Sequence, residues 1–263
     1  MDTPYDISEF VFSFEKGILK STQLVYNQME QRTEVDVAEI CLYSLFFRNC
    51  NIFETTLFLL SQNRIVGAEL LLRSLFEGTV ILEWCLIDPK ERPLRFNKNV
   101  IEGIIELAEN GFFHQDTEII KHYKDTKVWL DEKNLNGLPN FRQMVESLDT
   151  YNKDYAYSLY KYLSKNAHGV CTEWGDFLDV SDERAKVCSV RQPHPKRVLS
   201  CRIISLFLQL RNLISISSFG QFFNHDGIED IEHLQEMWNC IYVATYIDEN
   251  KPQLPTVPSV KLK

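Results

Sequence analysis

Three charged side chains recur at the spacing of one helix face within an otherwise apolar segment. Glu69, Arg73 and Glu77 stand at i, i+4 and i+8, while leucine and other apolar residues fill nearly every other position from Ile65 to Ile87. A helix that is apolar all round is a buried helix, so its charges must be paired. One guanidinium between two carboxylates leaves about one negative charge for another element to neutralise. Arg73 and Glu77 are therefore candidate catalytic residues, and Glu69 is a candidate ligand contact.

A second polar line lies about ninety residues further along the chain. Tyr160, Ser164 and His168 also stand at i, i+4 and i+8, and Gly169 ends the helix that carries them. A histidine at a helix C-terminus is favoured in its protonated form, and it can serve as a general acid or base near neutral pH. His168 is thus a third candidate catalytic residue and a candidate partner for the surplus carboxylate. Tyr160 and Ser164 are candidate substrate contacts.

Each of these lines also has a structural interpretation. The Glu69–Arg73–Glu77 line is equally explained as an internal ion-pair network that fixes the register of buried helices. A histidine before glycine more commonly makes a hydrogen bond at a helix end. A third polar line, on an otherwise apolar helix, either closes the same pocket or faces water; its members are Arg202, Ser205, Gln209 and Asn212.

Metal and cofactor chemistry is not expected. Glu69, Glu77 and His168 offer metal-ligand atoms, but the paired Glu-x-x-His motifs of di-iron bundles are absent. Nucleotide-binding and hydrolase motifs, such as a P-loop or Gly-x-Ser-x-Gly, are missing as well. The seven cysteines are scattered without zinc-finger spacing, which is typical of reduced thiols in a cytoplasmic protein.

The charge balance limits how nucleic acid could bind. The chain carries 37 acidic and 28 basic residues, a formal net charge of −9. A whole-surface attraction to phosphate is therefore excluded, and RNA or nucleotide binding would need a local site. The two most apolar stretches, Leu42–Leu60 and Ile203–Phe223, are each interrupted by charged or amide side chains. We expect buried helices there rather than membrane spans, and no leader segment at the acidic start.

Hydrophobic periodicity predicts an all-α fold, a single multi-helix bundle with a long irregular loop near 170–194 and a short strand at Lys186–Val190. We expect one helical domain over residues 1–249 and an extended proline-containing tail over 250–263. Thr33 is the expected N-cap of the second helix. The expected helices are Asp6–Gln31, Glu34–Ser61, Arg64–Ile87, Leu94–Glu109, Thr117–Glu132, Phe141–Leu148, Asp154–Ala167, Pro195–Asn224 and Ile228–Asp248.

The two polar lines together resemble a known pattern. The segment from Ala68 to Glu77, with Arg73-Ser-x-x-Glu77, and the later Tyr160, Ser164 and His168 resemble a widespread family of mostly bacterial helical proteins of unknown function. That family is similar in turn to the HEPN-like (higher eukaryote and prokaryote nucleotide-binding) bundles, many of which are ribonuclease toxins or antiviral-defence proteins. One departure is clear: the HEPN nuclease signature of an arginine closely followed by a histidine is absent before His168, where the nearest basic residue is Lys161.

Two functional hypotheses follow. In the first, which the resemblance implies, the chain is a cytoplasmic HEPN-like toxin or defence effector that acts on RNA or a nucleotide without a metal. His168 is then the acid or base, Arg73 stabilises phosphate charge and Glu77 orients one of them. In the second, the chain is a non-catalytic interaction or sensor subunit whose polar cluster is structural. A homodimer, and a protein partner encoded in the same operon, are the expected assemblies; no membrane association is expected.

Overall fold

The computed structural model describes residues 7–111, 117–149, 153–167, 178–181, 184–187, 195–220 and 225–246. Within these ranges the chain is all-α apart from one short hairpin, which confirms the predicted fold class. The helices are α1 (Ile7–Glu30), α2 (Val37–Ser61), α3 (Ile65–Ile87), α4 (Arg92–Glu109), α5 (Thr117–Asp131), α6 (Phe141–Glu146), α7 (Lys153–Ala167), α8 (Pro195–Gly220) and α9 (His225–Tyr246). The strands are β1 (Leu178–Ser181) and β2 (Arg184–Val187).

Local signals explain most helix ends. α3 stops at Ile87, where Pro89 disfavours helix in the residue before it. After α4, Gly111 takes a positive φ of 79°, a conformation that glycine adopts without strain. The predicted start of the second helix was wrong, because α2 begins at Val37 rather than Glu34. Its N-cap is Asp36, which forms a capping box with Glu39, and not Thr33.

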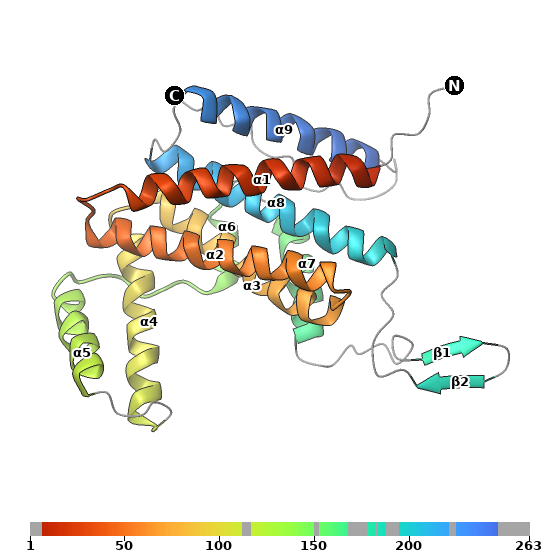
Figure 1. Cartoon of the computed structure of the whole chain (residues 1–263). Helices are drawn as coiled ribbons and strands as arrows, with labels where there is room; N and C mark the ends of the chain where they lie inside the picture. Colours follow the sequence, from red (N-terminus) through yellow and green to blue (C-terminus); the bar gives the residue numbers. More distant parts are fainter. Residues whose placement is uncertain are drawn as a thin grey trace.

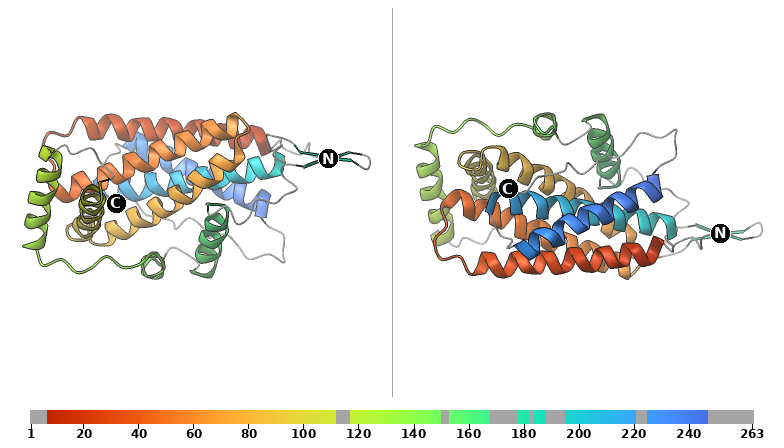
Figure 2. Two further views of the ribbon diagram at one scale, coloured as in Figure 1. Left: turned by 90° about the horizontal axis from the view of Figure 1, so that it is seen from below. Right: turned by 90° about the horizontal axis from the view of Figure 1, so that it is seen from above.

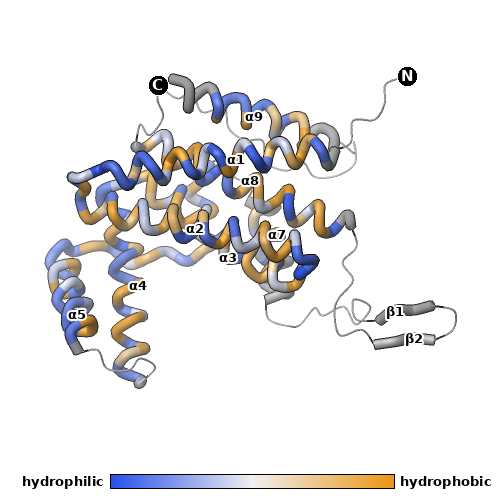
Figure 3. The backbone as a smooth tube through the Cα atoms, viewed as in Figure 1, coloured by the Kyte–Doolittle hydropathy of each residue, from blue (hydrophilic) through white to orange (hydrophobic). Residues whose placement is uncertain are grey.

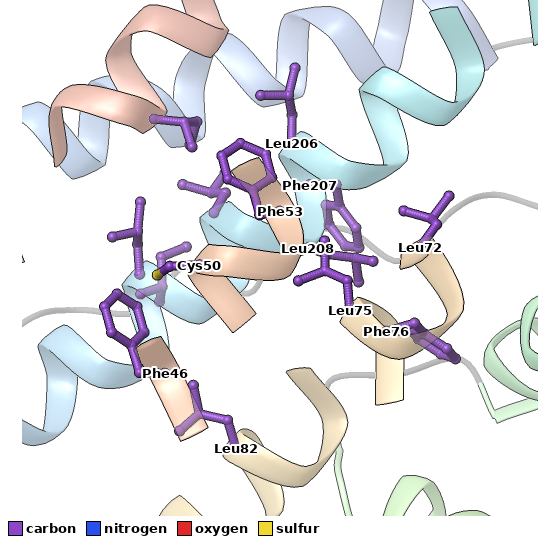
Figure 4. Packing of buried hydrophobic residues seen from close by; sticks show 14 of the residues in the cluster. Phe46, Cys50, Phe53, Leu72, Leu75, Phe76, Leu82, Leu206, Phe207 and Leu208 are labelled. Atoms are coloured by element: carbon purple, nitrogen blue, oxygen red, sulfur yellow. The ribbon is translucent and has the colours of Figure 1, made fainter. Parts of the chain in front are cut away.

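The bundle is built around α3. This helix packs against α2, α8, α7, α4 and α6, which accounts for its apolar character on every side. α1 and α9 lie side by side on the far side of α8 from α3 (Figures 1 and 2). Figure 4 shows the interior, where aromatic and leucine side chains from α2, α3 and α8 meet. They include Phe46, Phe53, Leu75 and Leu208, all of which are buried.

The helix α8 forms the other half of this interior. Among the described helices, it alone holds a stretch long and apolar enough to cross a membrane, Arg197–Gly220, and the most apolar part of that stretch is mostly buried inside the bundle. Such burial is what a core helix of a bundle shows. The expectation of buried helices at both apolar stretches is confirmed, since α2 is lined with buried residues as well.

Two features project from the bundle. α4 runs away from it, and α5 packs alongside α4 to form a helical hairpin (Figure 1). This hairpin has a small core of its own, made by Ile101, Ile105 and Leu130. The second feature is the antiparallel pair β1–β2, in which Leu178 faces Val187 and Ser181 faces Arg184. The predicted strand at Lys186–Val190 overlaps β2, which runs from Arg184 to Val187, in its first two residues, and residues 188–190 lie outside the described residues.

Candidate functional site

Arg73 and Glu77 project from α3 toward α7. The Arg73 Nε donates a hydrogen bond to Glu77 Oε1 at 3.0 Å, and its second guanidinium nitrogen, Nη2, donates to the Tyr160 hydroxyl at 3.4 Å. The guanidinium carbon also lies 5.4 Å from the centre of the Tyr160 ring, within cation–π range. The structure therefore brings together three of the six predicted site residues.

This cluster is neither fully buried nor freely solvated. The Arg73 side chain is 21% exposed and that of Glu77 is 31% exposed. Burial by itself would lower the pKa of Arg73, but the hydrogen bonds and charges of Glu77 and Tyr160 outweigh it and raise that pKa above its ordinary value. The guanidinium consequently keeps its positive charge at every pH of interest, while about a fifth of the side chain is exposed.

An aromatic stack holds Tyr160 in place. Its ring lies 4.5 Å from that of Phe141, nearly face to face, and Phe141 meets Phe76 of α3 edge-on at 5.7 Å. Phe141 is the first residue of α6, whose start is fixed by a capping box between Asn140 and Gln143. Three helices thus set the position of the phenol, and a short helix that sequence patterns treat as incidental is part of the site.

Ser164 is the next residue of the predicted polar line on α7. Ser164 stands one turn beyond Tyr160, and its Oγ is buried without a hydrogen-bond partner in the described part of the chain. A buried hydroxyl with no partner is uncommon, because it forfeits the hydrogen bonds it made to water. His168 follows the last residue of α7, Ala167, and lies outside the described residues. The predicted convergence of His168 with Arg73 remains a prediction.

Glu69 has a partner that the sequence did not point to. Both of its carboxylate oxygens accept hydrogen bonds from Arg197 of α8, at 2.6 and 3.0 Å. The Glu69 side chain is only 3% exposed, and the Cys201 thiol lies 4.0 Å from it. The predicted surplus of negative charge on α3 is therefore neutralised at Glu69 by an arginine on another helix. A second pair of the same kind joins Glu83 to Arg211.

Arg197 had no signal in the sequence. It stands in the first turn of α8 beside other basic residues, where a charged side chain is ordinary, and only the packing of α8 on α3 brings it to Glu69. Spacing within a helix predicts which charges share a face. It does not predict which helix lies opposite that face, so this partner could not be inferred.

Three residues of the third polar line pack inside the bundle, and the fourth, Arg202, is partly exposed. Ser205, Gln209 and Asn212 are fully buried, so they do not face water. Ser205 donates to the backbone carbonyl of Arg202 in its own helix, Gln209 donates to Thr22 of α1, and Asn49 of α2 donates to Asn212. Arg202, at the end of the line, lies 3.5 Å from Glu15 of α1. This seam helps to align helices and is separate from the candidate site.

The described residues offer no ready-made metal centre. No group of three or more histidine, cysteine, aspartate or glutamate side chains within them lies close enough to hold an ion. The functional groups at the α3–α7 face are instead an oriented arginine, a carboxylate beside it, a phenol and a buried hydroxyl. Such a set suits the binding of an anion or the stabilisation of negative charge.

Comparison with known families classifies the chain. A model described as a family of unknown function (DUF5677) matches residues 39–185, more than half of the sequence. The chain belongs to the DUF5677 family. The matched region runs from α2 through β1 and so contains Arg73, Glu77, Tyr160, Ser164 and His168. Arg197, on α8, lies outside the DUF5677 region. No curated protein and no solved structure matched the chain.

Proposed function

We propose that this DUF5677 protein is a HEPN-like helical protein that acts on RNA or on a nucleotide at the face shared by α3 and α7. The observation that carries the proposal is the state of Arg73: a permanently charged guanidinium, oriented by Glu77 and Tyr160, with about a fifth of its side chain exposed. Arginine presents its donors in a planar fork that matches phosphate oxygens, which favours a phosphate-bearing ligand.

Each residue of the site takes a role in this proposal. Arg73 stabilises the negative charge that develops on the phosphate, and Glu77 holds the guanidinium in position. His168 accepts the proton of a ribose 2′-hydroxyl as that oxygen attacks the neighbouring phosphorus. The bond from phosphorus to the 5′-oxygen breaks, and this oxygen takes up a proton as it leaves. Tyr160 and Ser164 contact the substrate, and no metal takes part.

Cleavage assays with point variants test the proposal. Purified full-length protein is incubated with total cellular RNA and with single-stranded oligonucleotides. We expect His168→Ala to abolish cleavage, and Arg73→Ala to lower kcat by about 10²–10³-fold, the usual effect of losing one donor to a developing charge. The matched control is Arg142→Ala on α6, which removes an arginine that also forms an i,i+4 pair with a glutamate. It should leave the rate unchanged.

The stability of the same variants separates chemistry from folding. Because Arg73 and Glu77 are 21% and 31% exposed, their pair resembles a surface pair worth about 1 kcal/mol or less. Arg73→Ala should therefore stay folded. A folded Arg73→Ala or His168→Ala protein that cleaves at the original rate would contradict the proposal, as would a wild-type protein without any effect on RNA or nucleotides.

A second function is favoured by the buried pairs. Glu69 is 3% exposed and both of its oxygens are bonded by Arg197, and Glu83 and Arg211 are 8% and 3% exposed, which supports a structural role for the charges of α3. We propose as the alternative that the chain is a non-catalytic interaction or sensor subunit. In that case Arg211→Ala, which breaks the buried pair with Glu83, lowers stability by about 3–5 kcal/mol, whereas Arg73→Ala abolishes no activity. We propose as well that the chain is cytoplasmic, that it has a toxin or antiviral-defence role, and that it has a protein partner encoded in the same operon.

A further inference from the structure

Arg48 of α2 is a basic residue without an acidic partner. It is exposed, and its guanidinium makes no hydrogen bond or ion pair with any residue that the structure describes. On α2 itself, no aspartate or glutamate stands three or four residues away from it. α3 offers no carboxylate either, because each of its three glutamates already has an arginine; the pairs are Glu69–Arg197, Glu77–Arg73 and Glu83–Arg211. The fold therefore leaves Arg48 available to an anion from outside the chain.

The guanidinium of Arg48 lies against α3, beside the candidate site. Both α2 and α3 are largely hydrophobic, with isolated hydrophilic residues along them (Figure 3). A Cβ added at Gly78 would lie 3.1 Å from the Nη1 of Arg48, so this group rests on a stretch of backbone that carries no side chain. Gly78 directly follows Glu77, which accepts the hydrogen bond of Arg73. One arginine thus contacts Glu77 from α3 itself, and a second approaches the next residue from α2.

Part of α3 between its contacts with α7 and α2 is exposed. Toward α7 this helix presents Arg73, and toward α2 it presents Gly78. At about 100° per residue, Leu70 and Glu77 lie between those two directions. Leu70 is 39% exposed, and the side chain of Glu77 is 31% exposed. A ligand that Arg73 binds can therefore follow this face of α3 toward Arg48.

The charges along this face favour a ligand with more than one phosphate. The guanidiniums of Arg48 and Arg73 outnumber the carboxylate of Glu77 by two to one, so the face is locally positive although the chain has a formal net charge of −9. Each guanidinium presents a planar fork of donors that matches phosphate oxygens. Because the two arginines approach from the α7 side and from the α2 side, each can bind a phosphate of its own.

We propose that Arg48 binds a second phosphate of the substrate, next to the scissile phosphate that Arg73 contacts. The substrate is then an RNA strand that crosses α3 and extends at least one phosphate beyond the scissile one, rather than a mononucleotide. This inference rests on the proposed function of the α3–α7 face. Arg48 touches no reacting atom in this arrangement, so it is a substrate-binding residue that affects KM more than kcat.

Cleavage of short synthetic RNAs of two lengths tests the role of Arg48. A dinucleoside monophosphate contains only the scissile phosphate, and trinucleoside diphosphates add one phosphate on its 5′ or its 3′ side. With the wild-type protein, one of the longer RNAs should have a kcat/KM about tenfold higher, because it gains a charge-assisted hydrogen bond. Arg48→Ala should bring this ratio close to unity, mainly through KM. Arg73→Ala should lower kcat/KM for both lengths and keep their ratio.

Two controls isolate the charge of the second phosphate. A methylphosphonate in its place is neutral, so it should lower the wild-type ratio to that of Arg48→Ala. Arg64→Ala is the matched control variant, because Arg64 directly precedes α3, is exposed, and likewise pairs with no carboxylate among the described residues. This variant should keep the wild-type ratio. Circular dichroism would establish that both variants stay folded.

The possible failures of the inference and of the proposed function are distinct. RNA cleavage with a wild-type ratio near unity would overturn the inference alone, as would a ratio that Arg48→Ala leaves unchanged or that Arg64→Ala lowers equally. A wild type that cleaves no RNA would contradict the proposed function, and binding would then decide the inference. Arg48→Ala should raise the Kd of a 2′-O-methyl trinucleotide about tenfold. An unchanged or unmeasurable Kd would overturn the inference.

Discussion

At the scale of single residues, the clearest constraint is the contact between Gly78 and Asn49. Asn49 is fully buried between α2, α3 and α8, and its amide nitrogen donates to Asn212 at 3.2 Å. Its Oδ1 points at the backbone of Gly78, where a Cβ would lie only 2.0 Å away. Gly78 directly follows the candidate catalytic residue Glu77, so the packing of α2 on α3 also fixes the turn that carries Glu77.

Gly78→Ala is therefore expected to be strongly destabilising despite adding a single methyl group. Asn49 cannot move away without breaking its bond to Asn212, and overpacking of this kind costs about 1–3 kcal/mol. Urea unfolding of both proteins gives the difference. The matched control is Gly137→Ala, in a segment where a Cβ meets nothing within 4 Å of the described residues. A free energy of unfolding for Gly78→Ala equal to that of the control would show that the α2–α3 contact is not as tight as described.

At the scale of elements, the sequence predicted the helices but not their neighbours. Helix limits depend on local signals such as Pro89, Gly111 and apolar periodicity, and most observed ends lie within a few residues of the predicted ones. The pairing of Glu69 with Arg197 depends on how α8 packs against α3, and the burial of Gln209 depends on α1. These are properties of the tertiary fold. Because the sequence does not show that α8 packs on α3, it could suggest only His168 as a cationic partner for the carboxylates of α3.

The contact between α1 and α8 contains a carboxyl group in an unfavourable setting. Glu15 of α1 is 14% exposed, and its Oε2 lies 3.5 Å from the Nε of Arg202. Neither of these two atoms makes a hydrogen bond within the described residues. Burial raises the pKa of Glu15 above its ordinary value of 4.5, and the charge of Arg202 offsets this only in part. Ionised Glu15 therefore costs the folded state free energy relative to protonated Glu15.

The stability of the protein should reflect this carboxyl group as pH changes. Because the pKa of Glu15 is higher in the folded chain than in the unfolded one, its contribution is fully present below about pH 4.5 and is lost as pH rises through the folded pKa. Glu15→Gln should remove that component, so the variant gains stability relative to the wild type as the pH rises above about 4.5. Unfolding titrations across this range measure the difference. Glu9→Gln, at an exposed position of the same helix, is the control. Parallel wild-type and Glu15→Gln curves would contradict the assignment.

At the scale of the whole molecule, the acidic surface limits how RNA can be held. With a formal net charge of −9, the chain repels a polyanion except where cations are gathered, and the proposed site supplies one fixed cation, Arg73, beside the imidazole of His168. Proteins that bind nucleic acid along a broad basic surface contact many phosphates and lose affinity steeply with salt. A protein that reaches one or two phosphates in a single site should behave differently.

The salt dependence of RNA binding measures this difference directly. Each phosphate contact to a single strand contributes about −0.7 to the slope of log K against log salt concentration, so two contacts predict a slope of about −1.4. Fluorescence anisotropy with a 2′-O-methyl oligonucleotide, which lacks the attacking hydroxyl, isolates binding from cleavage. Arg73→Ala should reduce the slope by about one contact, while Arg142→Ala should leave it unchanged. A slope several times steeper that Arg73→Ala does not change would mean that RNA binds elsewhere on the molecule. That result would contradict the assignment of the α3–α7 face as the RNA site.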